Sequence, residues 1–98
     1  MTTTGGVELA EKTMLIQNEL GLHARAATKL VQLASRYPCE IVVTGPDGQS
    51  ANAKSVMGVL LLCGSQGTVI DVRAKGTDSR AAIEAIGALI AGRFGEPE

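Results

Sequence analysis

The sequence predicts an α+β fold in which helices pack on an antiparallel sheet, with the element order β-α-β-β-α-β-α. Three observations favour this class. The turn sequence Gly45-Pro46-Asp47-Gly48 separates two strand-like segments and indicates a hairpin. The strand expected over 68–75 alternates apolar and charged residues, which leaves one face of the sheet in water. Two segments have the periodicity of amphipathic helices, which would cover the other face.

The chain is expected to begin with an extension followed by a single domain. Residues 1–11 are mostly small and polar, and we expect them to be a flexible N-terminal extension. The apolar run Met14-Leu15-Ile16 predicts a first strand over 12–18, so the folded domain would span 12–98.

The other elements follow from apolar spacing, caps and breakers. Pro38 ends the first helix, Ser55 is an N-cap candidate for the second, and Gly64 follows its end. The expected ranges are a helix over 24–36, hairpin strands over 39–44 and 49–53, a helix over 55–62, a strand over 68–75, and a last helix that starts after 77–79 and fades by 95. The expected buried positions are Ala27, Leu30, Val31 and Ala34 in the first helix and Ala82, Ile83, Ile86, Leu89 and Ile90 in the last.

Composition excludes several classes of function. The net charge is −1 and no cluster of Lys and Arg occurs, so the basic surface of a nucleic-acid or membrane-surface binder is missing. No apolar run approaches the roughly 20 residues of a membrane span, and the first residues lack the pattern of a signal peptide. We therefore expect a cytoplasmic protein. Cys39 and Cys63 are expected to be buried, reduced thiols, and a zinc site combining them with His23 would lack a fourth ligand, so no metal is expected.

The strongest chemical signal is His23, the only histidine, which stands directly before the first helix. First-turn N–H groups and the helix dipole favour phosphate there, and the same potential disfavours imidazolium, so the ring is expected to stay neutral and nucleophilic. Arg25 could offer planar donors to phosphoryl oxygens. No carboxylate lies close in sequence that would activate water against a phosphoryl adduct. The simpler alternative is a histidine with only a local role as a loop or cap residue.

A second segment, Asn52-Ala53-Lys54-Ser55-Val56-Met57-Gly58, predicts a short apolar helix. Capping alone would explain Ser55. The helix is too short to bury every side, however, so Val56, Met57 and Leu60 are expected to form an exposed docking patch. Phosphate on Ser55 would be favourable at the helix N-terminus and would place negative charge on this patch, as an electrostatic off-switch.

Together, Gly21-Leu22-His23-Ala24-Arg25 and the segment 52–58 resemble the HPr family, the histidine phosphocarriers of the phosphoenolpyruvate-dependent phosphotransferase system. The resemblance extends from about Lys12 to Arg93. It implies an HPr-like open-faced β-sandwich, a four-stranded antiparallel sheet covered on one face by three helices.

The resemblance also implies site residues and partners. His23 would be phosphorylated on Nδ1 by phosphorylated enzyme I and would pass the group to an enzyme IIA-type acceptor, with Arg25 contacting the phosphoryl group. Ser55 would be the serine that HPr kinase/phosphorylase modifies in some bacteria. The implied partner-binding residues are Ala24, Thr28, Val56, Met57 and Leu60. No cofactor is implied.

Alternatives remain at two levels. Ala26 stands where many sugar-type members have proline, and Ala26-Ala27 is similar to the nitrogen-related branch, so the downstream pathway is open. The main rival is a purely regulatory HPr-like binding protein controlled through Ser55. Family members of that regulatory kind lack the histidine that is present here. A free-standing enzyme is disfavoured because one His, one Arg and one Ser make no hydrolytic constellation. We expect a monomer that acts stoichiometrically, not an enzyme.

Overall fold

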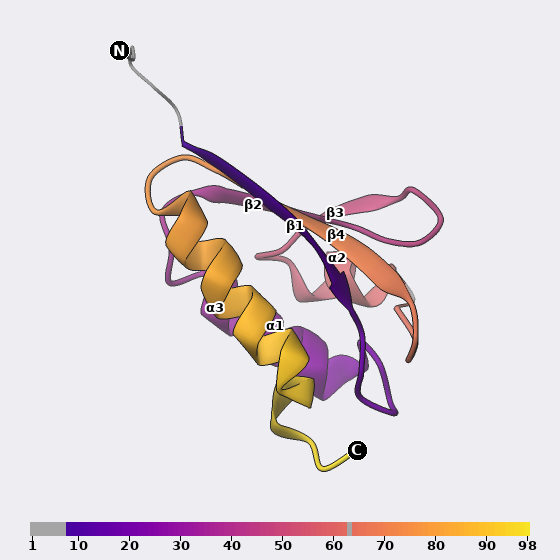
Figure 1. Ribbon diagram of the computed structural model, residues 1–98. Coiled ribbons are helices and arrows are strands. Elements are labelled where there is room, and N and C mark those ends of the chain that lie inside the picture. The colour runs from indigo at the N-terminus through magenta and orange to yellow at the C-terminus, as the bar shows by residue number, and fades with distance from the viewer. Residues whose placement is uncertain (1–7, 63) are drawn as a thin grey trace.

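A four-stranded antiparallel sheet in the order β1-β4-β2-β3 carries the helices on one face (Figure 1). The structure is a computed structural model that describes residues 8–62 and 64–98. Its elements are β1 Leu9–Leu15, α1 Ala24–Ala34, β2 Glu40–Thr44, β3 Ser50–Asn52, α2 Val56–Leu60, β4 Val69–Lys75, α3 Ser79–Ala91 and the 3-10 turn η1 Arg93–Gly95. The predicted element order and the open-faced sandwich are confirmed.

The central strand β4 divides the sheet into a buried and a wet face. Its residues Ile70, Val72 and Ala74 are buried beneath the helices, while the side chains between them lie on the other face, as the alternation predicts. On the wet face, Arg73 Nη2 lies 3.5 Å from Glu11 Oε2 of β1. One layer of helices therefore suffices to cover the apolar side chains of the sheet.

The helices α1 and α3 bury the stripes that their spacing predicts. The buried residues are Ala26, Ala27, Leu30 and Ala34 in α1, and Ser79, Ala82, Ile83, Ile86 and Ile90 in α3. Val31 and Leu89, which were expected in these stripes, are only partly buried. Within residues 8–62 and 64–98, no helix has the length and apolarity needed to cross a membrane.

The expected start of the folded domain at residue 12 is wrong. The strand β1 begins at Leu9, which pairs with Lys75, and it ends at Leu15 instead of residue 18. The backbone of β1 pairs along the whole length of β4, whether or not the β1 side chains are apolar. The apolar run at residues 14–16 therefore did not mark the start of the strand. Glu8 also belongs to the fold, because its Oε1 accepts hydrogen bonds from the backbone N–H and the hydroxyl of Ser79 at the start of α3. Of the expected extension, residues 1–7 lie outside the described residues.

Between residues 24 and 75, every element begins and ends within two residues of its expected range. The second helix is the short case, since α2 proper spans only Val56–Leu60. Ser55 is its N-cap, and Ser55 Oγ accepts a hydrogen bond of 3.1 Å from the backbone N–H of Gly58. The capping role expected for this serine is confirmed.

Candidate functional site

His23 is the N-cap residue of α1. Its backbone is extended, with φ −71° and ψ 177°, and its carbonyl accepts a 2.8 Å hydrogen bond from the N–H of Ala27. In this fully described first turn, no side-chain hydrogen bond caps the helix and no acidic residue is present. The free N–H groups of the turn therefore remain available beside the imidazole.

The loop before His23 is fixed by close backbone packing. Gly21 has φ +66°, and a Cβ atom there would come within 2.4 Å of the carbonyl oxygen of Gly64. That same carbonyl accepts a 2.7 Å hydrogen bond from the N–H of Leu22. Because residue 64 follows α2 shortly in the chain, this packing places His23 and the end of α2 in one region of the surface.

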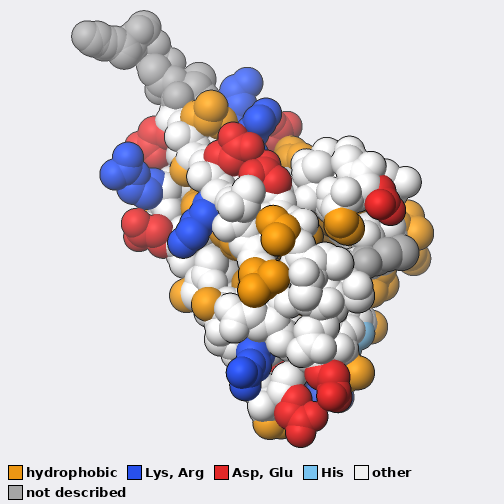
Figure 2. Space-filling model, turned by 45° about the vertical axis from the view of Figure 1, so that its right-hand side comes forward, with side chains coloured by type: hydrophobic (Ala, Val, Ile, Leu, Met, Phe, Trp, Pro, Cys, Tyr) orange, Lys and Arg blue, Asp and Glu red, His pale blue; other side chains and the backbone are white. Residues whose placement is uncertain are grey.

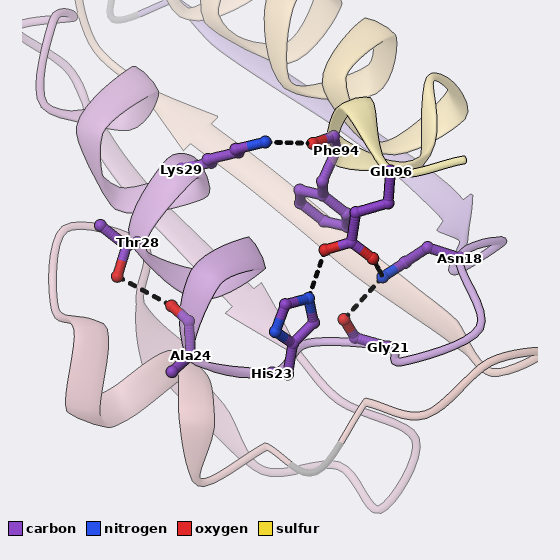
Figure 3. A network of polar contacts seen from close by, with 8 residues as sticks. All are labelled: Asn18, Gly21, His23, Ala24, Thr28, Lys29, Phe94 and Glu96. Carbon is purple, nitrogen blue, oxygen red and sulfur yellow. Dashed lines mark hydrogen bonds and ion pairs between the residues drawn. The ribbon is translucent and has the colours of Figure 1, made fainter. Parts of the chain in front are cut away.

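A carboxylate lies against the imidazole, contrary to what the sequence around His23 suggested. Glu96 Oε2 pairs with His23 Nε2 across 73 residues of chain, and Glu96 Oε1 accepts a 2.9 Å hydrogen bond from Asn18 Nδ2 (Figure 3). The side chains of His23 and Glu96 are 25% and 10% exposed. The expectation of no nearby carboxylate was wrong because it considered only neighbours in sequence.

The C-terminal segment, residues 93–98, is held against α1 and the loop before it by contacts on both sides of Glu96. Phe94 is fully buried, and its carbonyl accepts a 2.6 Å hydrogen bond from Lys29 Nζ of α1. The carbonyl of Glu98 accepts a 2.9 Å hydrogen bond from the N–H of Glu19. The carboxylate of Glu96 is therefore positioned by a buried anchor and not by a free tail.

The electrostatics of Glu96 favour the ionised form. Burial acts to raise the pKa of its carboxyl group, but hydrogen bonds from His23 and Asn18, with the positive charge of Arg25, bring that pKa below its usual 4.5. Glu96 is therefore a carboxylate at neutral pH and can only accept hydrogen bonds.

Arg25 is exposed on the first turn of α1, as the sequence predicts. Among the described residues it forms no ion pair. It lines a shallow hollow of about 180 Å³ that is also bordered by Leu20, Glu96 and Pro97. An exposed guanidinium that forms no ion pair within the described residues can offer its N–H donors to an added phosphoryl group.

The expected docking residues differ in exposure. Met57 is 67% exposed, and so is Leu61 one turn later, which was not among the expected docking residues. Val56 and Leu60 are partly buried because they pack against the core, so they contribute less exposed surface than expected. The two site residues on α1, Ala24 and Thr28, are exposed and joined by a hydrogen bond from Thr28 Oγ1 to the carbonyl of Ala24, as Figure 3 shows.

The molecular surface in Figure 2 carries Lys, Arg, Asp and Glu side chains interspersed, with no field of one sign on the face shown. The site holds one imidazole and a carboxylate whose two oxygens are both already in contact with protein groups, with the exposed guanidinium of Arg25 on the same helix turn. This arrangement suits the binding of a phosphoryl group on the imidazole.

A family model described as "PTS HPr component phosphorylation site" matches residues 10–92. The chain belongs to the HPr family. It is 46% identical over 88 residues to the phosphocarrier protein HPr of Xylella fastidiosa (strain 9a5c), covering 90% of this chain and 98% of that protein. It is 45% identical over 86 residues to the phosphocarrier protein NPr of Shewanella violacea, covering 88% and 93%.

Solved structures support the same membership in the HPr family. The crystal structure of HPr-C-His from Thermoanaerobacter tengcongensis has a TM-score of 0.86 and 44% identity, covering 91% of this chain and 99% of that one. A crystal structure of an HPr dimer from the same organism has a TM-score of 0.71 and 45% identity, covering 89% and 99%. The chain is thus a phosphocarrier of the phosphotransferase system, and the resemblance drawn from the two motifs is confirmed.

Proposed function

We propose that His23 accepts a phosphoryl group on Nδ1 from phosphorylated enzyme I and passes it to an enzyme IIA-type acceptor. The observation that carries this proposal is the placement of His23 at the N-cap of α1, with uncapped first-turn N–H groups beside the ring. These donors and the helix dipole stabilise the added negative charge. Arg25 adds a cationic donor on the same turn.

The arrangement supports storage of the phosphoryl group instead of its hydrolysis. Glu96, the carboxylate paired with the ring, engages Asn18 and His23 through its two oxygens and lies on the Nε2 side. An activated water at Nδ1 would need a base on the other side of the ring. The protein therefore acts stoichiometrically and turns over only with partner enzymes.

Docking is proposed to use Ala24, Thr28, Met57 and Leu61, with smaller contributions from Val56 and Leu60. Gly64, which follows α2, packs against the loop before His23, and this packing supports a partner that contacts α2 and the imidazole together. Ser55 is proposed as a phosphorylation site for an HPr kinase/phosphorylase. A phosphate there would stand next to the apolar docking residues.

We propose that this carrier acts in the cytoplasm, where enzyme I and phosphoenolpyruvate would supply the phosphoryl group.

The relatives include both HPr and NPr proteins, so the proposed acceptor is either a sugar-type or a nitrogen-type IIA protein. Discharge of the phosphorylated protein to one purified acceptor of each type, compared by rate, assigns the branch.

The test of the proposed function is phosphorylation by purified enzyme I and phosphoenolpyruvate. The wild-type protein is expected to gain an acid-labile phosphoryl group, and His23→Ala is expected to gain none, because no other histidine is present. Circular dichroism of both proteins controls for folding. An adduct in His23→Ala, or no adduct in the wild-type protein, contradicts the assignment. If the wild-type protein gains no phosphoryl group from enzyme I but Ser55 can be phosphorylated by a kinase, the results favour a purely regulatory protein.

A further inference from the structure

A neutral imidazole carries one proton, on either Nδ1 or Nε2, and only the unprotonated nitrogen can attack phosphorus. Phosphorylation on Nδ1 therefore requires the tautomer with hydrogen on Nε2. We propose that Glu96, oriented by Asn18, is the positioning residue that fixes this tautomer of His23. The tautomer can be measured directly, whereas its consequence for transfer rests on the proposed function.

The geometry around Glu96 leaves one consistent pattern of hydrogen bonds. Asn18 is fully buried, and its Nδ2 donates both to the carbonyl of Gly21, at 2.8 Å, and to Glu96 Oε1. Turning the amide over would place its oxygen against two other oxygens, so its orientation is fixed. The second oxygen of Glu96 then faces His23 Nε2, which must donate because a carboxylate can only accept.

Figure 3 shows the other ring nitrogen of His23 pointing away from Glu96, on the side of Ala24 and the first turn of α1. The imidazole thus presents its lone pair toward the free N–H groups of the helix and its proton toward the carboxylate. The buried Phe94 and the hydrogen bond from Lys29 to its carbonyl hold the carboxylate in place before any partner arrives.

This arrangement lets transfer proceed without moving a proton. The lone pair of Nδ1 forms the new bond to phosphorus while the bond between phosphorus and enzyme I breaks. The electron pair of the broken bond stays with enzyme I, which is the leaving group. The hydrogen on Nε2 stays in place throughout. The positive charge that the ring gains faces the carboxylate of Glu96, and discharge to the acceptor reverses the same steps.

The closing experiment measures the tautomer in the unphosphorylated protein. Because His23 is the only histidine, the long-range ¹H–¹⁵N spectrum of its ring is free of overlap. At a pH where the ring is neutral, the wild-type protein is expected to show mainly the Nε2–H form. In Glu96→Gln, the amide oxygen is expected to keep the hydrogen bond from Asn18, so the amide NH₂ faces Nε2 and shifts the ring to the Nδ1–H form.

Two further variants separate orientation from simple loss of contact. Glu96→Ala is expected to leave a mixture of tautomers, and the control Glu98→Gln is expected to match the wild-type protein, since Glu98 contacts the loop through its backbone. With enzyme I, Glu96→Gln is expected to be phosphorylated at least about tenfold more slowly at saturation, with little change in KM, because the wrong tautomer blocks Nδ1. It should also be slower than Glu96→Ala.

Either of two results from the ring spectra would overturn the inference: a wild-type ring that is mainly Nδ1–H, or an unchanged tautomer in a folded Glu96→Gln variant. A Glu96→Gln variant phosphorylated no more slowly than Glu96→Ala would do the same. If the wild-type protein is not phosphorylated at all, the proposed function fails, but the spectra of the unphosphorylated proteins still decide whether Glu96 sets the tautomer.

Discussion

The two ring nitrogens of His23 have different neighbours, and this difference explains what the residue can do. Nε2 contacts a carboxylate, whereas the opposite side of the ring faces the first turn of α1, where no side-chain hydrogen bond caps the helix. The carboxylate orients the ring and the helix end receives negative charge. The nucleophilic nitrogen, Nδ1, and the N–H groups that can bind an anion therefore lie on the same side of the imidazole.

Arg25 should contribute to transfer and not to folding, because its side chain is exposed and forms no ion pair within the described residues. Arg25→Ala is expected to slow phosphorylation by enzyme I on the order of 10- to 100-fold, with little change in the melting temperature. Stopped-flow transfer and thermal unfolding measure the two quantities. Arg36→Ala removes an exposed arginine just beyond the far end of the same helix and should leave the rate unchanged. Normal transfer in Arg25→Ala would remove Arg25 from the site.

The lowered pKa of Glu96 predicts how stability depends on pH. A carboxyl group with a lower pKa in the folded state stabilises the fold above its unfolded value, here the usual 4.5, and this contribution is lost as pH falls through the folded pKa. The free energy of unfolding of the wild-type protein should therefore exceed that of Glu96→Gln at pH 7, and the two should converge in acid. Urea titrations across this range measure the difference, and a difference that grows in acid would contradict the assignment.

At the level of elements, α2 joins a structural cap to a docking surface. Ser55→Ala removes the acceptor for the N–H of Gly58 and should cost about 1 kcal/mol in the free energy of unfolding. Ser55→Asp retains a capping side chain, so it should be nearly as stable as the wild-type protein but bind enzyme I more weakly through the added charge. Urea unfolding and calorimetric titration separate the two effects; unchanged affinity in Ser55→Asp would leave Ser55 as a cap alone.

The elements show where local sequence suffices to predict structure. Periodic apolar stripes located α1 and α3, and the turn at 45–48 located the hairpin, because these signals act over a few residues. The start of β1 was misplaced because Leu9 is held by pairing with Lys75, far along the chain. Strand ends depend on the partner strand, which a local pattern does not contain.

The same distinction of local and distant signals applies to the site. His23, Arg25 and Ser55 stand at helix starts that a sequence can show. Glu96 could not be found in this way, because it reaches the ring from beyond α3 through a turn with positive φ at Arg93 and Phe94. The one available signal was an aromatic residue in a polar C-terminal segment, which predicts a buried anchor close to the carboxylate.

For the molecule as a whole, we propose a monomer that contacts its partners transiently. The edge strand β3 has only three residues, and the edge strand β1 carries the charged Glu11 and Lys12, which oppose pairing between sheets. Sedimentation velocity over a wide range of concentration should show the mass of one chain. A stable dimer, as in the crystal structure from T. tengcongensis, would contradict this expectation.

The measurement that tests the central claim most directly follows one phosphoryl group through the protein by ³¹P NMR. After phosphorylation and removal of enzyme I and phosphoenolpyruvate, the protein should show a single phosphoramidate resonance on Nδ1 of His23, one per chain. Addition of the IIA acceptor should transfer this signal to the acceptor. A resonance on another atom, or an adduct that decays to inorganic phosphate equally fast with and without the acceptor, would contradict the account of a carrier.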